Sequence, residues 1–172
     1  RCIKEYGLSK PSEILDQLTD IVIETFEADG TEVKDGMDIS LCSIDRESRL
    51  VEFAGANNPL WISKGESTTA ESIIEIKGDK QPIGSFEHRK PFTNHSIQLE
   101  KGDSIYMFTD GFADQFGGEK GKKFKYKPFR KLIAENSNLP MEQQRTHLDY
   151  SFEKWRGEFE QVDDICLIGV RL

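Results

Sequence analysis

Six short strand-like segments follow one another between residues 36 and 110 with no helical pattern between them. They either alternate apolar and polar residues or run apolar, and Asn and Pro at positions 57–59 supply turn geometry. The predicted strands cover residues 36–45, 49–55, 60–65, 72–77, 92–99 and 103–110, with a seventh at 163–172. Apolar residues at helical spacing predict helices at 9–30, 126–136 and 140–158. Because βαβ alternation is absent, the sequence predicts an α+β fold with a largely antiparallel sheet.

The length and charge of the chain limit its organisation and its partners. A chain of 172 residues is the size of one ordinary domain, so we expect a single domain over residues 1–172. The net charge of −8 disfavours nucleic acid and anionic membranes, and no apolar run approaches the ~18 residues of a membrane span. The basic, glycine-rich segment 117–127 is predicted to be a solvated loop.

The three cysteines indicate a reducing compartment. Cys2, Cys42 and Cys166 form an odd, widely spaced set without a CxxC motif. Cys42 and Cys166 lie in strand-like patterns, so we expect both to be reduced core thiols in a cytoplasmic protein.

Acidic residues stand at the ends of two apolar strand segments. Asp110 follows the apolar run 105–108 and Thr109, whereas Asp163 and Asp164 precede the closing strand. If these strands are antiparallel neighbours, their acidic ends meet at one sheet edge, where converging carboxylates take up protons or bind a cation. Carboxylate oxygens suit magnesium, manganese or calcium. Each motif alone also fits a plain structural role, because Asp-Gly is a common hairpin turn and paired Asp residues often face water.

A resemblance to a known family extends this interpretation. The segment "LEKGDSIYMFTDGFADQFGG" at 99–118 resembles the Thr-Asp-Gly block of PPM-type metal-dependent protein serine/threonine phosphatases, in the bacterial branch typified by SpoIIE and RsbU. "FAGANNPLWI", "KQPIG" and "VDDICLIGV" resemble further blocks of that branch, in the expected order. The implied fold is two packed, mainly antiparallel β-sheets flanked by helices, an α-β-β-α sandwich.

The resemblance also implies a chemistry and a partner. It implies hydrolysis of phosphoserine or phosphothreonine on a phosphorylated regulatory protein, with two Mn²⁺ or Mg²⁺ ions and a water between them. By matched position, Asp110 and Asp163 are the catalytic metal ligands, and Gly111 lets the backbone approach metal-bound waters. Asp164 and Thr109 match positions that support the ligands.

Two motifs of the family, a Gly-Asp and an Asp-x-x-Gly-His-Gly, are absent from this sequence. We therefore expect about half of the ligand set and an N-terminally incomplete catalytic domain, an incomplete fragment of a signalling protein. Asp35 and Asp38 are poor replacements, since Asp38 is expected on a solvated strand face. The alternatives are a non-catalytic PPM-like protein-binding module and a plain structural domain. Strand edges left open in such a fragment predict a homodimer or higher association.

Overall fold

The computed structural model describes residues 1–28, 36–65 and 69–172, which divide into two compact units. The first unit comprises Arg1–Leu60 and Lys77–Leu99, and the second comprises Trp61–Ile76 and Glu100–Leu172. The expectation of a single domain stays a prediction. No helix in the described ranges is long and apolar enough to span a membrane.

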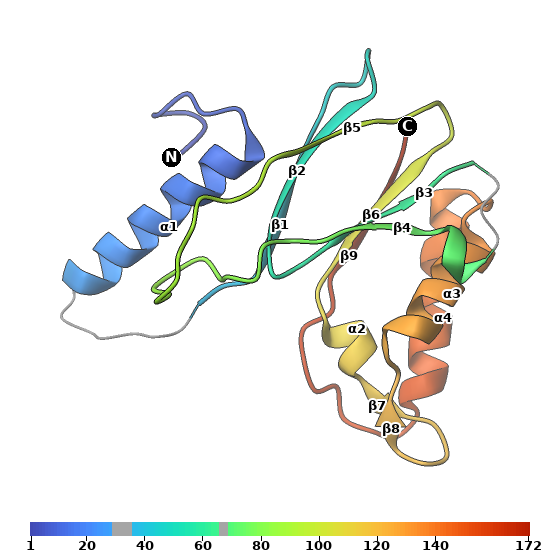
Figure 1. Cartoon of the computed structure of the whole chain (residues 1–172). Coiled ribbons are helices and arrows are strands. Elements are labelled where there is room, and N and C mark those ends of the chain that lie inside the picture. The colour runs from blue at the N-terminus through green and yellow to red at the C-terminus, as the bar shows by residue number, and fades with distance from the viewer. Residues whose placement is uncertain (29–35, 66–68) are drawn as a thin grey trace. The chain divides into compact units, whose positions relative to one another are not determined.

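The first unit packs one helix against a three-stranded antiparallel sheet (Figure 1). Its elements are α1 (Pro11–Ala28), β1 (Ile39–Ile44), β2 (Leu50–Ala56) and β5 (His95–Gln98), with the strands in the order β1-β2-β5. The apolar face of α1 buries Leu15 in a core that also contains Ala54, Ala56, Ile83 and Phe92. Asn57 ends the second strand with φ = 59°, a left-handed conformation that asparagine tolerates better than most residues.

The second unit contains a four-stranded sheet in the order β4-β3-β6-β9. Its strands are β3 (Leu60–Ser63), β4 (Ile74–Ile76), β6 (Ser104–Phe108) and β9 (Leu167–Arg171). Its helices are η1 (Ala70–Ser72), α2 (Gly111–Asp114), α3 (Tyr126–Asn136) and α4 (Met141–Arg156), and β7 (Phe116–Gly117) pairs with β8 (Lys122–Lys123). The predicted α+β class with antiparallel sheets is thus confirmed.

An aromatic core stabilises the second unit. Trp61 and Phe108 from the sheet lie with ring centroids 4.4 Å apart. Phe112 of α2 stacks on Phe129 of α3 at 4.5 Å and contacts Phe152 of α4 at 5.2 Å. All five side chains are buried, so burial of large aromatic surface fixes α2 against α3 and α4.

Two elements differ from the sequence-based expectation. The residues after Asp110 form the one-turn helix α2, although Asp-Gly is equally typical of a hairpin turn. The segment 117–127, predicted to be a solvated loop, contributes both Gly117 of β7 and the whole of β8, and these strands pair antiparallel. Both elements are too short to produce a hydrophobic period in the sequence.

Candidate active site

The antiparallel pairing of β6 with β9 brings the predicted acidic segments to one edge of the sheet. In the register of these strands, Phe108 lies opposite Leu167, and Ser104 lies opposite Arg171. Asp110 follows β6 by two residues, and Asp164 precedes β9 by three, so both segments leave the sheet on the same side (Figure 1). The condition that the sequence interpretation required, antiparallel neighbouring strands, is met.

Thr109 joins the two segments. Its N–H donates to the carbonyl of Cys166 at 3.0 Å, and its hydroxyl donates to the carbonyl of Asp164 at 2.9 Å. The same hydroxyl oxygen accepts the N–H of Cys166 at 3.0 Å. Because one side chain makes two hydrogen bonds to the backbone directly before β9, the loop carrying Asp163 and Asp164 is fixed to the end of β6.

Gly111 allows the close approach of these segments. A Cβ atom at this position would lie 2.5 Å from the carbonyl oxygen of Asp164 and 3.1 Å from Cγ1 of Ile165. Contacts below 3.0 Å do not occur for real Cβ atoms, so any side chain here would push the acidic loop away. The structure therefore gives Gly111 a steric role against Asp164, whereas its expected role beside metal-bound waters stays a prediction.

The carboxylates themselves face solvent. Asp110 is exposed and stands at the N-terminus of α2, where its carbonyl accepts the N–H of Asp114 at 2.9 Å. Asp163 is exposed, and its Oδ1 accepts the N–H of Asp164 at 2.7 Å. The observed contact of Asp164 with Thr109 is made by its backbone carbonyl, so its support of the edge does not depend on its carboxylate.

The ligand set at this edge is partial. Within residues 1–28, 36–65 and 69–172, no group of three or more His, Cys, Asp or Glu side chains is arranged to hold a metal ion. Asp38 is exposed and accepts the side-chain N–H of Asn57 at 2.7 Å, in accord with a solvated position, and Asp35 lies outside the described residues. Asp110 and Asp163 supply hard oxygen donors of the kind that magnesium and manganese prefer.

Gln115 is a site residue that the sequence did not reveal. Its side chain is fully buried, and its amide donates to the carbonyls of Phe116 and Glu160, both at 2.9 Å. Its Oε1 accepts the N–H of Val162 at 3.4 Å, and its backbone carbonyl accepts Nε1 of Trp155 at 3.0 Å. Gln115 thus connects the end of α2 to the segment directly before Asp163. The sequence "FADQF" at 112–116 gave no signal for it, because Gln115 follows another polar residue, Asp114.

The environment of Cys166 differs from the sequence-based expectation. It was expected to be a core thiol, but its side chain is exposed. It lies directly before β9, and its N–H donates to the Thr109 hydroxyl oxygen. Cys42 agrees better with the expectation, because it is partly buried and burial raises the pKa of its thiol to about 12.

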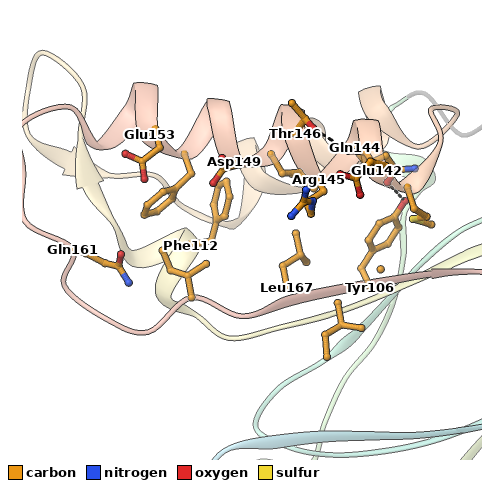
Figure 2. A pocket seen from close by; sticks show the side chains of 16 residues that line it. Tyr106, Phe112, Glu142, Gln144, Arg145, Thr146, Asp149, Glu153, Gln161 and Leu167 are labelled. Atoms are coloured by element: carbon orange, nitrogen blue, oxygen red, sulfur yellow. Dashed lines mark hydrogen bonds and ion pairs between the residues drawn. The ribbon is translucent and has the colours of Figure 1, made fainter.

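A cleft of about 820 Å³ lies between α4 and the segment 161–169. Figure 2 shows Glu142, Arg145, Asp149 and Glu153 along α4, facing Leu167 and Phe112. Its only cationic side chain among the lining residues, Arg145, pairs with Glu142 at 2.6 Å. A phosphate group would meet an excess of carboxylates there, so the charge of the cleft disfavours an anion.

Comparison with known proteins gives a family match over nearly the whole chain. The family model described as stage II sporulation protein E (SpoIIE) matches residues 3–172. No curated protein matches the sequence.

Solved structures share the fold. The SiaA-PP2C domain of Pseudomonas aeruginosa is 28% identical with a TM-score of 0.86, covering 99% of this chain and 64% of that domain. The manganese-presoaked SpoIIE phosphatase domain from Bacillus subtilis is 19% identical with a TM-score of 0.57, covering 99% of this chain and 68% of that one. RsbX in complex with magnesium is 13% identical with a TM-score of 0.61, over 97% and 67%. The present chain therefore spans just under two thirds of the SiaA-PP2C domain.

Proposed function

Because this chain belongs to the SpoIIE family of PP2C-type phosphatase domains, we propose that it supplies part of a metal-dependent protein serine/threonine phosphatase site. The substrate in this proposal is phosphoserine or phosphothreonine on a regulatory protein of a signalling pathway. The activity of the complete domain requires further ligands, which the described residues do not supply.

One observation carries the proposal: the acidic edge formed by β6 and β9. The Thr109 hydroxyl bonded to the Asp164 carbonyl and the steric fit of Gly111 against that carbonyl hold two acidic segments together, although they are 53 residues apart at Asp110 and Asp163. This constrained junction brings two exposed carboxylates, Asp110 and Asp163, to the same edge of the sheet.

The residues present fit a divalent metal ion in their chemistry. Asp110 and Asp163 would hold it through carboxylate oxygens, because magnesium is commonly bound by one or two carboxylates and several waters. When bound, such ions lower the pKa of a water molecule and neutralise charge on a phosphoryl group. Manganese in the SpoIIE domain and magnesium in RsbX are named for those relatives, and both are candidates here.

The other residues of the edge position these ligands. Thr109 and the backbone of Asp164 fix the loop that carries Asp163, while Gln115 fixes the residues directly before it. Preorganised ligands bind a metal ion without the cost of ordering the loop.

The test is hydrolysis of a phosphothreonine peptide in MnCl₂ by a longer protein that supplies the missing Gly-Asp and Asp-x-x-Gly-His-Gly motifs, as wild type and as three single variants. Asp110→Asn and Asp163→Asn are expected to lower turnover roughly a hundredfold or more, as for loss of a charged group at a reacting centre. Asp149→Asn is the matched control, because Asp149 is an exposed carboxylate on α4. Equal turnover in all four proteins would refute the proposal.

A second function is favoured by the incomplete ligand set: a non-catalytic PPM-like module that binds a partner protein. It predicts no hydrolysis by the wild-type chain in manganese or magnesium, even when the missing Gly-Asp and Asp-x-x-Gly-His-Gly motifs are supplied in a longer protein. Hydrolysis by that longer protein would favour the enzyme.

The cysteines support a cytoplasmic setting for either function. All three are free thiols, and free thiols persist in reducing compartments. Cell fractionation that recovers the protein in an oxidising compartment would contradict this part of the proposal.

A further inference from the structure

Residues 119–131 are strongly basic in an acidic protein. They contain seven of the 23 Lys and Arg residues of the chain and one carboxylate, Glu119. The rest of the chain has 16 Lys and Arg residues against 30 Asp and Glu residues. The segment forms the turn of the β7–β8 hairpin, the strand β8 and the beginning of α3. Such a contrast creates a local positive potential on a surface that is otherwise negative.

Four of these cations are available for a partner. Lys123 pairs with Asp114 at 2.8 Å, Arg130 with Glu75 at 2.5 Å and Lys131 with Glu135 at 3.5 Å. The remaining four form no ion pair with the part of the chain that the structure describes, and all are exposed: Lys120, Lys122, Lys125 and Lys127. These four residues form the lysine group.

The lysine group is connected by hydrogen bonds to the helix that begins at the acidic edge. The N–H of Lys125 donates to the carbonyl of Ala113 at 2.7 Å, and the N–H of Phe124 donates to the carbonyl of Gln115 at 2.9 Å. Ala113 belongs to α2, which begins directly after Asp110. The backbone of this segment is therefore attached to the C-terminal part of α2, the one-turn helix that follows Asp110, within the same compact unit.

The backbone that carries the group is held in place. Lys125 has φ = 75° and ψ = 156°, a region that residues other than glycine rarely adopt unless their surroundings impose it. On the other side of the hairpin, the N–H of Gly118 donates to the carbonyl of Trp155 at 2.8 Å. A Cβ atom on Gly117 would lie 1.9 Å from that carbonyl oxygen, so the hairpin contacts α4 closely. The lysines thus project from a supported element rather than from a free loop.

We propose that the lysine group is the docking surface for an acidic segment that flanks the phosphorylated residue of the substrate protein. This inference rests on the proposed function, and it adds the substrate class: a phosphoprotein with carboxylates beside its phosphosite. A short acidic peptide bound at the lysine group can place its carboxylates within about one Debye length, ~8–10 Å, of these cations, where their attraction is little screened. A long polyanion such as DNA also meets the negative remainder of the surface, which disfavours it.

The test measures peptide binding apart from catalysis. Two fluorescein-labelled phosphothreonine peptides, one flanked by Glu residues and one with Gln in their place, are titrated with the chain, and fluorescence anisotropy is recorded. The variant carries Lys120→Gln, Lys122→Gln and Lys127→Gln, and it leaves Lys125 in place because of its unusual φ. The matched control carries Lys4→Gln, Lys80→Gln and Lys101→Gln, three exposed lysines outside the segment.

The wild-type chain is expected to bind the acidic peptide about tenfold more tightly than the neutral one at low salt. That preference is expected to disappear in the variant, to persist in the control and to weaken as salt rises. Equal loss in variant and control, or equal affinity for both peptides, would overturn the inference. Tighter binding of a single-stranded DNA oligonucleotide than of the acidic peptide would also overturn it.

Two further measurements separate loss of docking from loss of folding. Circular dichroism of the variant and the control verifies that both are folded. Lys127→Glu alone is expected to weaken binding of the acidic peptide, as the triple variant does. Hydrolysis of p-nitrophenyl phosphate reports on the acidic edge independently of docking. A longer protein that contains the Gly-Asp and Asp-x-x-Gly-His-Gly motifs, binds the acidic peptide and hydrolyses nothing would refute the proposed catalysis and retain the docking surface. Hydrolysis by that protein without a preference for the acidic peptide would refute the docking surface and retain the catalysis.

Discussion

At the scale of single residues, the buried amide of Gln115 organises the acidic edge. We predict that Gln115→Leu lowers the free energy of unfolding by about 1–3 kcal/mol, because the Glu160 carbonyl and the Val162 N–H lose their buried partner. Urea unfolding measures the change. Gln143→Leu, an exposed Gln on α4, is the matched control and should change stability by less than ~0.5 kcal/mol. Equal effects of the two substitutions would contradict this role.

The cysteines differ in reactivity because their environments differ. At pH 8 a thiol with a pKa of about 12 is ionised in roughly one molecule in ten thousand, so Cys42 should resist alkylation while exposed Cys166 reacts. Mass spectrometry after brief iodoacetamide treatment checks the order, with Cys166→Ser to identify the fast site. Labelling of Cys42 before Cys166 in the folded chain would show that the burial of Cys42 is misassigned.

At the scale of elements, the strands and long helices were predictable, because alternating and helical hydrophobic periods extend over enough residues to be recognised. The sequence also predicted that the segments carrying Asp110 and Asp163 meet at one edge if their strands are antiparallel neighbours. The pairing of β6 with β9 meets that condition. The contacts of Gln115 and the steric reason for Gly111 were not predictable, because both depend on Glu160–Ile165 arriving from far along the chain. The helical turn α2 was missed because four residues carry no period.

The attachment of α1 to the segment 89–92 gives a prediction on pH. Oδ1 of Asp16 accepts the N–H of Phe92 at 3.1 Å, and burial raises the pKa of Asp16 above 3.8, although the Phe92 N–H and Arg89 oppose the shift. The folded chain then binds more protons than the unfolded chain just above pH 3.8. This carboxyl therefore lowers stability progressively as pH rises from 3.8 through its folded pKa.

Asp16→Asn keeps an acceptor for Phe92 and removes the titration. Its unfolding free energy relative to wild type should increase as pH rises through that window and stay constant above it. Urea unfolding of both proteins at several pH values measures the difference. A difference that decreases with rising pH would contradict the assigned direction.

At the scale of the whole molecule, open sheet edges predict self-association. β4 and β9 are the edges of the four-stranded sheet among the described strands, and Ile74 and Ile168 on them are 41% and 48% exposed. Apolar edge strands tend to pair with another copy, so we predict a homodimer or larger species by light scattering at micromolar concentration. Ile168→Lys should shift the chain toward monomer, because a charged edge residue opposes strand pairing. A wild-type chain that is monomeric at that concentration would contradict this prediction.

The central claim is that the edge formed by β6 and β9 binds a divalent metal ion through Asp110 and Asp163. Isothermal titration calorimetry with MnCl₂ on the wild-type chain, Asp110→Asn and the control Asp149→Asn tests it directly. The account predicts manganese binding to the wild type and the control, with loss of that binding in Asp110→Asn. No binding to the wild type, or the same binding to Asp110→Asn, would contradict it.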